Sequence, residues 1–153
     1  MPFKSAVLTL GLALGCALAV PALALDYRSV GSNAILYDAP STKGVKHFII
    51  ARGTPVEVVL TQENWTKVRD SGGNMAWIET RLLAAARTLQ VRADKADVRA
   101  AADDKSAVVF SAEKNVVLDL VDAARSDATP GWARVKHRDG QVGFVKAAQV
   151  WGL

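Results

Sequence analysis

ENWTKVRDSGGNMAWI, residues 63–78, aligns without a gap on PGWARVKHRDGQVGFV, residues 130–145, at a constant offset of 67 (132 minus 65). Three pairs of positions are identical: Trp65 and Trp132, Val68 and Val135, and Gly73 and Gly140. Other pairs keep the residue class, since an aromatic side chain stands opposite an aromatic one and a cation opposite a cation. The pattern therefore indicates an internal repeat, and a true repeat should extend upstream.

The repetition does extend upstream, with an offset of 62 (98 minus 36). Leu36 then aligns with Val98, Phe48 aligns with Phe110, and VEVV at 56–59 aligns with LDLV at 118–121. The change of offset from 62 to 67 requires an insertion of five (67 minus 62) in the second copy. We expect it between Val121 and Gly131, where the small and polar residues DAARSDATPG are typical of a surface loop that tolerates insertion.

Each copy has the patterns of short β-strands. VEVV and LDLV alternate with the period of two that half-buries a strand. Gly53 and Asn115 occupy one equivalent position, and both residue types tolerate a left-handed backbone, so a turn is expected before that strand. SGG and RDG each separate two apolar alternating runs, which predicts two hairpins.

The stretch RLLAAARTL lies between the copies. Residues 84–86 could begin a short helix or form the junction itself, and we place the domain boundary there. This gives a first domain at 25–86 and a second at 87–153. Domains of this size are marginal alone, so we expect the copies to pack together, with Trp151 covering the seam.

The N-terminal segment 1–24, MPFKSAVLTLGLALGCALAVPALA, has the organisation of a secretory signal peptide. One cation, Lys4, precedes an apolar run that ends in Ala22-Leu23-Ala24. A membrane anchor is the alternative, but the run stops short of the ~20 apolar residues that a span needs. A lipoprotein site at Cys16 fits less well. We therefore expect cleavage near Ala24, a periplasmic or secreted protein, and no membrane span after cleavage.

The mature chain expected after cleavage contains no cysteine, because Cys16 leaves with the signal peptide. Disulfides and a thiol nucleophile are then excluded from it. Its charges are balanced: seven cations against six acids at 25–86 give +1, and eleven against nine at 87–153 give +2. Nucleic-acid binding would need a clustered basic face, so no nucleic-acid partner is expected.

The first copy combines LYDAPS at 36–41, a GTPVEVV strand, a Trp-x-Lys-Val-Arg strand, a glycine-rich hairpin and a closing Ala-Trp-Ile. With these features it resembles a bacterial SH3-like (SH3b) domain. The second copy is similar but degenerate, since ADVRAAADD has lost the proline while GFV is kept. The resemblance implies an all-β protein of two tandem small SH3-like barrels, each with about five antiparallel strands. It also implies an accessory module that binds cell-wall peptide or another envelope protein.

Alternation within the strands points to a candidate ligand-binding residue. In the strand that begins at Trp65, Val68 lies on the face opposite to Trp65, and Trp132 is related to Val135 in the same way. If the valines are in the core, both tryptophans face outward. The resemblance agrees, because SH3-like domains keep an aromatic residue here in the ligand groove. A bulge that turns the ring inward, or a ring that caps the barrel, remains an alternative.

Tyr37 and Tyr27 are expected to line the same side of the first copy, with half-buried packing in the barrel as the alternative. Parity also separates Trp77 from Ile78 and Phe144 from Val145. Of these two pairs, we expect Ile78 and Val145 to be the core residues.

The sequence contains few candidates for catalytic or metal-binding residues. His47 and His137 stand at non-equivalent positions without a metal-binding motif, so no metal and no cofactor are expected. Asp103-Asp104 is expected in a solvated turn. The sequence therefore favours a secreted, non-enzymatic binding module for cell-wall peptide or peptidoglycan, with Trp65, Tyr37, Tyr27 and Trp132 as ligand-binding residues. The alternative is a structural protein that pairs with another envelope protein.

Overall fold

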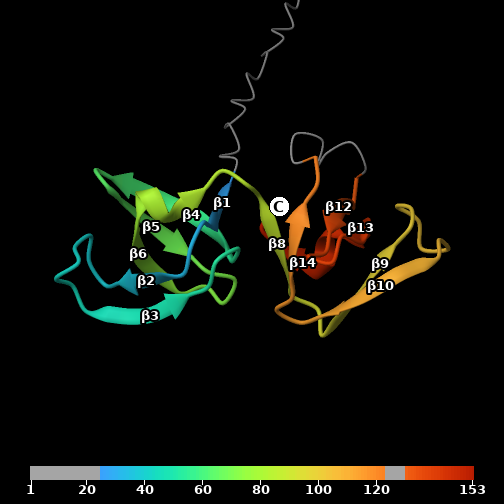
Figure 1. Cartoon of the computed structure of the whole chain (residues 1–153), viewed down its shortest axis with the longest axis horizontal. Coiled ribbons are helices and arrows are strands. Elements are labelled where there is room, and N and C mark those ends of the chain that lie inside the picture. The colour runs from blue at the N-terminus through green and yellow to red at the C-terminus, as the bar shows by residue number, and fades with distance from the viewer. Residues whose placement is uncertain (1–24, 123–129) are drawn as a thin grey trace, which may run out of the picture.

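The computed structural model describes residues 25–122 and 130–153. The expected signal peptide and most of the expected insertion loop lie outside the described residues. The described chain forms two antiparallel sheets that lie side by side along the long axis of the molecule (Figure 1). The predicted all-β class with two tandem domains is confirmed.

The first sheet has the strand order β3-β2-β6-β5-β4-β1-β7. Its strands are β1 (Asp26–Val30), β2 (Ala34–Tyr37), β3 (Lys46–Ile50), β4 (Pro55–Gln62), β5 (Trp65–Arg69), β6 (Met75–Glu79) and β7 (Leu83–Ala84). A 3₁₀ turn, η1 (Thr80–Leu82), joins β6 to β7. No helix forms at residues 84–86, because residue 84 ends β7 and the following two residues belong to the junction between the sheets.

The second sheet repeats this order as β10-β9-β13-β12-β11-β8-β14. Its strands are β8 (Thr88–Val91), β9 (Lys95–Arg99), β10 (Val108–Glu113), β11 (Val117–Leu120), β12 (Trp132–Lys136), β13 (Val142–Lys146) and β14 (Val150–Trp151). The turn η3 (Ala147–Gln149) corresponds to η1. Each sheet has seven strands where about five were expected, and the last of them, a two-residue strand, pairs with the first strand of its copy.

The pairing of strands is the same in both copies. Leu36 pairs with Phe48 and is followed by a bulge, and Val98 pairs with Phe110 beside an equivalent bulge. The offsets of 62 and 67 hold for all strands from β2 to β6. The first strand is different, because Val30 corresponds to Val91 at an offset of 61 (91 minus 30). The expectation of a single length difference is therefore wrong: the turn before β9 also contains one additional residue.

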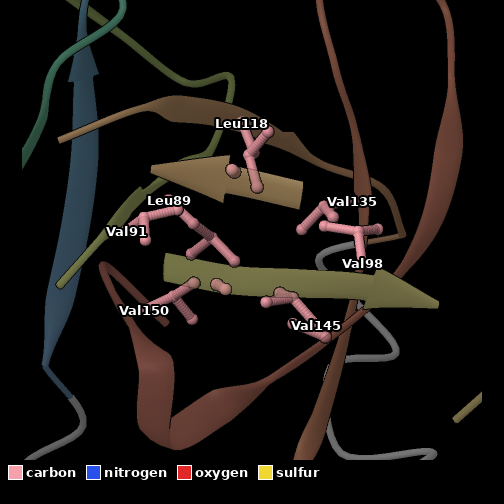
Figure 2. Close-up of a cluster of buried hydrophobic side chains, with 10 residues drawn as sticks. Leu89, Val91, Val98, Leu118, Val135, Val145 and Val150 are labelled. Atoms are coloured by element: carbon pink, nitrogen blue, oxygen red, sulfur yellow. The ribbon is translucent and has the colours of Figure 1, made fainter. Parts of the chain in front are cut away.

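Each copy has its own apolar core, and the two cores use equivalent positions. The first contains Val30, Ala34, Leu36, Ile50, Val56, Val68, Ala76 and Ile78. The second contains Leu89, Val91, Ala96, Val98, Ala112, Leu118, Ala133, Val135, Val145 and Val150 (Figure 2). Ile78 and Val145 are fully buried, as predicted. Smaller residues fill several positions of the second core, where Val98 replaces Leu36 and Ala112 replaces Ile50.

The turn before β4 has the backbone predicted from the sequence. Gly53 has φ +83° and Asn115, at the equivalent position, has φ +70°. In both copies the turn is hydrogen-bonded to the first strand, since Gly53 N–H donates to Val30 and Asn115 N–H donates to Val91. Only residue types that tolerate a positive φ fit this position without strain.

The two copies meet at a junction formed by Tyr27, Ser29, Gly53, Arg87, Thr88 and Trp151. The rings of Tyr27 and Trp151 pack edge to face, with centroids 5.1 Å apart. The hydroxyls of Ser29 and Thr88 lie 2.7 Å apart, and Thr88 donates to the carbonyl of Gly53 at 2.7 Å. At this junction β1 of the first sheet lies next to β8 and β14 of the second (Figure 1). Trp151 thus covers the seam, as expected.

Among the residues that the structure describes, no helix has the length and apolar character needed to cross a membrane.

Candidate functional site

Strand β5 places its side chains on two faces, as the alternation predicted. Thr66 and Val68 are each 1% exposed and face the core. Trp65 and Lys67 are partly exposed and face outward. Trp132 has the same position in β12, where Val135 is fully buried. Both tryptophans therefore point outward, because neither β5 nor β12 has a bulge that would change which face its side chains occupy.

The Trp65 ring lies against Tyr37. Their ring centroids are 5.5 Å apart and the planes are perpendicular, an edge-to-face geometry favoured by the quadrupoles of aromatic rings. Tyr37 is buried, at 8% exposed, and the partly exposed Trp65 ring packs against it. The indole is therefore held in one position by a partner from a different strand, and its remaining surface is available to a ligand.

Trp77 and Lys67 lie beside the Tyr37 and Trp65 rings; the Trp77 side chain is largely buried, at 9% exposed, and Lys67 is partly exposed. Trp77 pairs across the sheet with both Lys67 and Tyr37, and directly opposite residues share one face of a sheet. The ammonium group of Lys67 lies 6.0 Å from the centroid of the Trp77 ring. We call Tyr37, Trp65, Lys67 and Trp77 the aromatic face: three rings from three strands with one cation.

The equivalent surface of the second copy has a different chemistry. Arg99 pairs with Phe144 as Tyr37 pairs with Trp77, so a guanidinium replaces the phenol beside the tryptophan. Trp132 opens onto a pocket of about 180 Å³. The pocket is lined by Lys95, Asp97, Arg99, Asp104, Trp132, Lys146 and Gln149, and we call it the charged pocket.

Internal contacts occupy most of the charges in this pocket. The Lys146 ammonium lies 2.6 Å from Asp104 Oδ1 and 5.8 Å from the centroid of the Trp132 ring. Arg99 donates to the carbonyl of Ser106 at 2.7 Å and lies 3.9 Å from the carboxylate of Asp97. A ligand of Trp132 must therefore compete with ion pairs that the first copy does not have.

The expectation for Tyr27 requires a correction. Cross-strand pairing links Tyr27 to Glu57 and Glu57 to Arg69 in β5. However, the Tyr27 ring is 6% exposed and packs on Trp151, not beside Trp65. The guanidinium of Arg87 lies 5.6 Å from the Tyr27 ring centroid. Burial, followed by the charge of Glu57, raises the pKa of the Tyr27 phenol above its ordinary value of 10.0, while Arg87 opposes the shift. Tyr27 is therefore a junction residue.

The histidines lie apart from the aromatic face. His137 Nδ1 lies 3.0 Å from Asp139, and its ring contacts Phe110 with centroids 5.5 Å apart. The His47 ring is near Phe48, on the edge strand β3. Within residues 25–122 and 130–153, no group of three or more histidine, cysteine and acidic side chains is arranged to hold a metal ion.

The family follows from a comparison with protein-family models. The model described as bacterial SH3 domain matches residues 30–84 and again residues 92–152. The chain belongs to the bacterial SH3 domain family. The two matched segments coincide with the two sheets, so this chain contains two bacterial SH3 domains in tandem. The surfaces around Trp65 and Trp132 differ, since the aromatic face belongs to the first domain and the charged pocket to the second.

Three solved structures resemble the chain in part: NlpC2 and NlpC1 from Trichomonas vaginalis and an NlpC/P60 family protein from Bacillus cereus. They are 12%, 14% and 15% identical, with TM-scores of 0.38, 0.38 and 0.35, over 85%, 94% and 82% of this chain. The chain spans only 49%, 52% and 56% of their respective lengths. A search of curated proteins gave no match.

Sequence reasoning identified the two tryptophans and placed Tyr37 on the side of Trp65, but it missed the charged surroundings of Trp132. Arg99 and Lys146 align with Tyr37 and Glu79, and this alignment could have shown that the second copy replaces an aromatic partner with a cation. The contact of Lys146 with Asp104 has no such signal, because it depends on how the turn between β9 and β10 folds over the sheet.

Proposed function

We propose that the protein binds peptide of the bacterial cell wall through the aromatic face of its first SH3 domain. The observation that supports the proposal is the edge-to-face pair of Trp65 and Tyr37 on the outer side of the sheet. A partly exposed indole held in place by a second ring can bury a large area while losing little side-chain entropy. The family match supports a binding role.

The second domain contributes less to this binding in our proposal. The Trp132 ring is already in contact with Lys146, and Lys146 is paired with Asp104. Displacing such contacts costs free energy that a ligand must recover. The first domain is therefore the main binding site.

The test compares Trp65→Ala with Met75→Ala in a binding assay with purified peptidoglycan. Met75 is 49% exposed at the far end of the same hairpin, so it controls for the loss of any exposed apolar side chain. Trp65→Ala should weaken binding by about 2 kcal/mol or more, and Met75→Ala should leave it unchanged. Equal retention of both variants on peptidoglycan would refute the aromatic face as the binding site.

A protein partner in the cell envelope is the second candidate, and the edge strands favour it. Strand β3 ends the first sheet and exposes Ile49 to 75% and Phe48 to 39%, with Val45 beside it at 64%. Unpaired edge strands with apolar side chains can add a strand from another protein. Cross-linking of the exported protein followed by identification of partners separates this function from peptidoglycan binding.

Export is part of the proposal and has its own test. The organisation of segment 1–24 supports a signal peptide with cleavage near Ala24. N-terminal sequencing of protein recovered from the periplasm should begin near Leu25. An N-terminus at Met1, or a lipid on Cys16, would contradict cleavage by a signal peptidase of the ordinary secretory type.

A further inference from the structure

A groove crosses the junction on a surface that the aromatic face does not include. One hollow, of about 340 Å³, is lined by Arg52 of the first domain together with Val116, Val117, His137 and Arg138 of the second. A second hollow, of about 450 Å³, is lined by Phe110, Ser111, Ala112, Glu113, Val116, His137, Asp139 and Gln141. Val116 and His137 line both hollows, so the two hollows adjoin, and we call them together the junction groove. Each of the two volumes falls in the range of roughly 300 to 1,000 Å³ that is usual for ligand sites.

The walls of this groove are fixed by hydrogen bonds. The backbone N–H of Arg52 donates to Asn33 Oδ1 at 2.9 Å, which holds the turn that presents Arg52. The hairpin turn of the second domain is closed by bonds from His137 N–H to Gln141 and from Gly140 N–H to His137, at 2.8 and 2.9 Å. These bonds hold the backbone of the two turns that carry Arg52 and Arg138, so a ligand does not have to order those turns.

Opposite charges stand at its two ends. Arg52 and Arg138 line the first hollow, where no lining residue is acidic. Glu113 and Asp139 line the second. Asp139 already contacts His137, and the backbone N–H of Gln141 together with the His137 side chain lowers the pKa of the Asp139 carboxyl. Within residues 25–122 and 130–153, neither Arg52, Arg138 nor Glu113 takes part in an ion pair.

Between the charged ends the groove is apolar. The side chains of Val116 and Phe110 line it, and the His137 ring lies against Phe110. A ligand that fits this surface carries an anionic group at one end, a cationic group at the other and small apolar groups between them. A short peptide with free termini has these three features.

We propose that the junction groove binds a short extended peptide by its two termini. The terminal carboxylate lies between the guanidinium groups of Arg52 and Arg138, which form charge-assisted hydrogen bonds with it. The amino group lies toward Glu113, and the small side chains lie over Val116 and Phe110. Because each domain supplies one of the two arginines, the site exists only when both domains are packed together. This second site is independent of the aromatic face and of the function proposed for it.

The experiment is a titration of the ¹⁵N-labelled protein with tetra-alanine, observed by NMR. The backbone amide signals of Val116, Val117 and His137 should shift, while that of Trp65 should not. The C-terminal amide of tetra-alanine should bind at least about fivefold more weakly, because it lacks the carboxylate that the arginines recognise. N-acetylation should weaken binding as well, through the loss of the ammonium group.

Variants complete the test. Arg138→Ala should weaken tetra-alanine binding by about tenfold, as expected for the loss of a charge-assisted contact. Arg28→Ala is the matched control, because Arg28 is an exposed arginine outside the groove, and it should bind like the original protein. Trp65→Ala should also bind normally, which distinguishes this site from the aromatic face.

Three results would overturn the proposal: no shift of the groove signals, equal affinity for tetra-alanine and its amide, or shifts confined to the neighbourhood of Trp65 or Trp132. Inorganic phosphate is the probe for a simple anion site. If phosphate shifts the signals near Arg52 and Arg138 while tetra-alanine does not, the groove recognises an anion and not a peptide.

Discussion

Replacement of Thr88 by valine tests how firmly the two domains are joined. The Thr88 hydroxyl has one proton and donates it to the carbonyl of Gly53 at 2.7 Å. The 2.7 Å contact between the Ser29 and Thr88 hydroxyls must therefore be donated by Ser29. The chain of donation runs from Ser29 through Thr88 to Gly53, so it crosses from the first domain to the second and back.

The magnitude follows from what the substitution leaves unpaired. Ser29 is 3% exposed, so Thr88→Val leaves its buried hydroxyl without an acceptor, at a cost of about 1 to 3 kcal/mol. The carbonyl of Gly53 is partly accessible and can bond to water, which adds a smaller cost. We expect a total loss of about 2 to 3 kcal/mol in the free energy of unfolding. Ser29→Ala leaves the bond from Thr88 to Gly53 intact and should cost about 1 kcal/mol.

The double variant decides whether this account is correct. In Ser29→Ala/Thr88→Val the orphaned serine hydroxyl is gone, so the total cost should be about 1 kcal/mol smaller than the sum of the single costs. Urea unfolding of the four proteins measures these free energies. Additive costs, or a Thr88→Val variant as stable as Ser29→Ala, would show that the hydroxyls do not form the proposed chain.

Three further outcomes are expected. Val68→Ala should lower the free energy of unfolding by about 1 to 3 kcal/mol in a thermal unfolding experiment, because the Val68 side chain is 1% exposed. It should not cause the specific loss of binding that is expected of an outward residue. An unchanged stability would refute the assignment of strand faces by alternation. Because the pKa of Tyr27 is raised in the folded protein, its contribution to stability is complete below the ordinary value of 10.0 and is lost as the pH rises through the folded pKa. The stability of Tyr27→Phe should therefore fall less steeply with rising pH in the alkaline range than that of the original protein. Identical pH profiles of stability would contradict the raised pKa. Gly143→Ala should lower the stability of the protein more than Ala76→Gly, the substitution at the equivalent position in the first domain. A Cβ on Gly143 would lie 2.6 Å from the carbonyl oxygen of Arg99. Equal thermal midpoints of the two variants would refute this expectation.

Much of the fold could be predicted because the sequence contains an internal repeat. Alignment of the copies located the strands, and two positions with different residues supported each other, as Gly53 and Asn115 did for the left-handed turn. Local alternation gave the face of each strand residue, since successive side chains must point to opposite sides of a sheet. This argument placed Val68 and Val135 in the cores and turned Trp65 and Trp132 outward.

Alternation along a strand tells which face of the sheet a side chain occupies, but it does not tell what packs on that face. Tyr27 was expected beside Trp65, yet it is covered by Trp151, which lies in β14 near the opposite end of the chain. The additional residue before β9 was also missed, because the first strand of each copy is too different for alignment and only its hydrogen bonds to the turn before β4 reveal the shift.

The sequence by itself determined the repeat, the strand pattern, the turns and the core positions, because short-range sterics and the period of two act within a few residues. Only the tertiary structure decided the surroundings of each outward side chain. It placed a cation against the Trp132 ring and packed Tyr27 on Trp151, and it brought Arg52 of one domain and Arg138 of the other to one hollow. Such contacts depend on how the two sheets bend and pack, and no local pattern in the chain encodes that geometry.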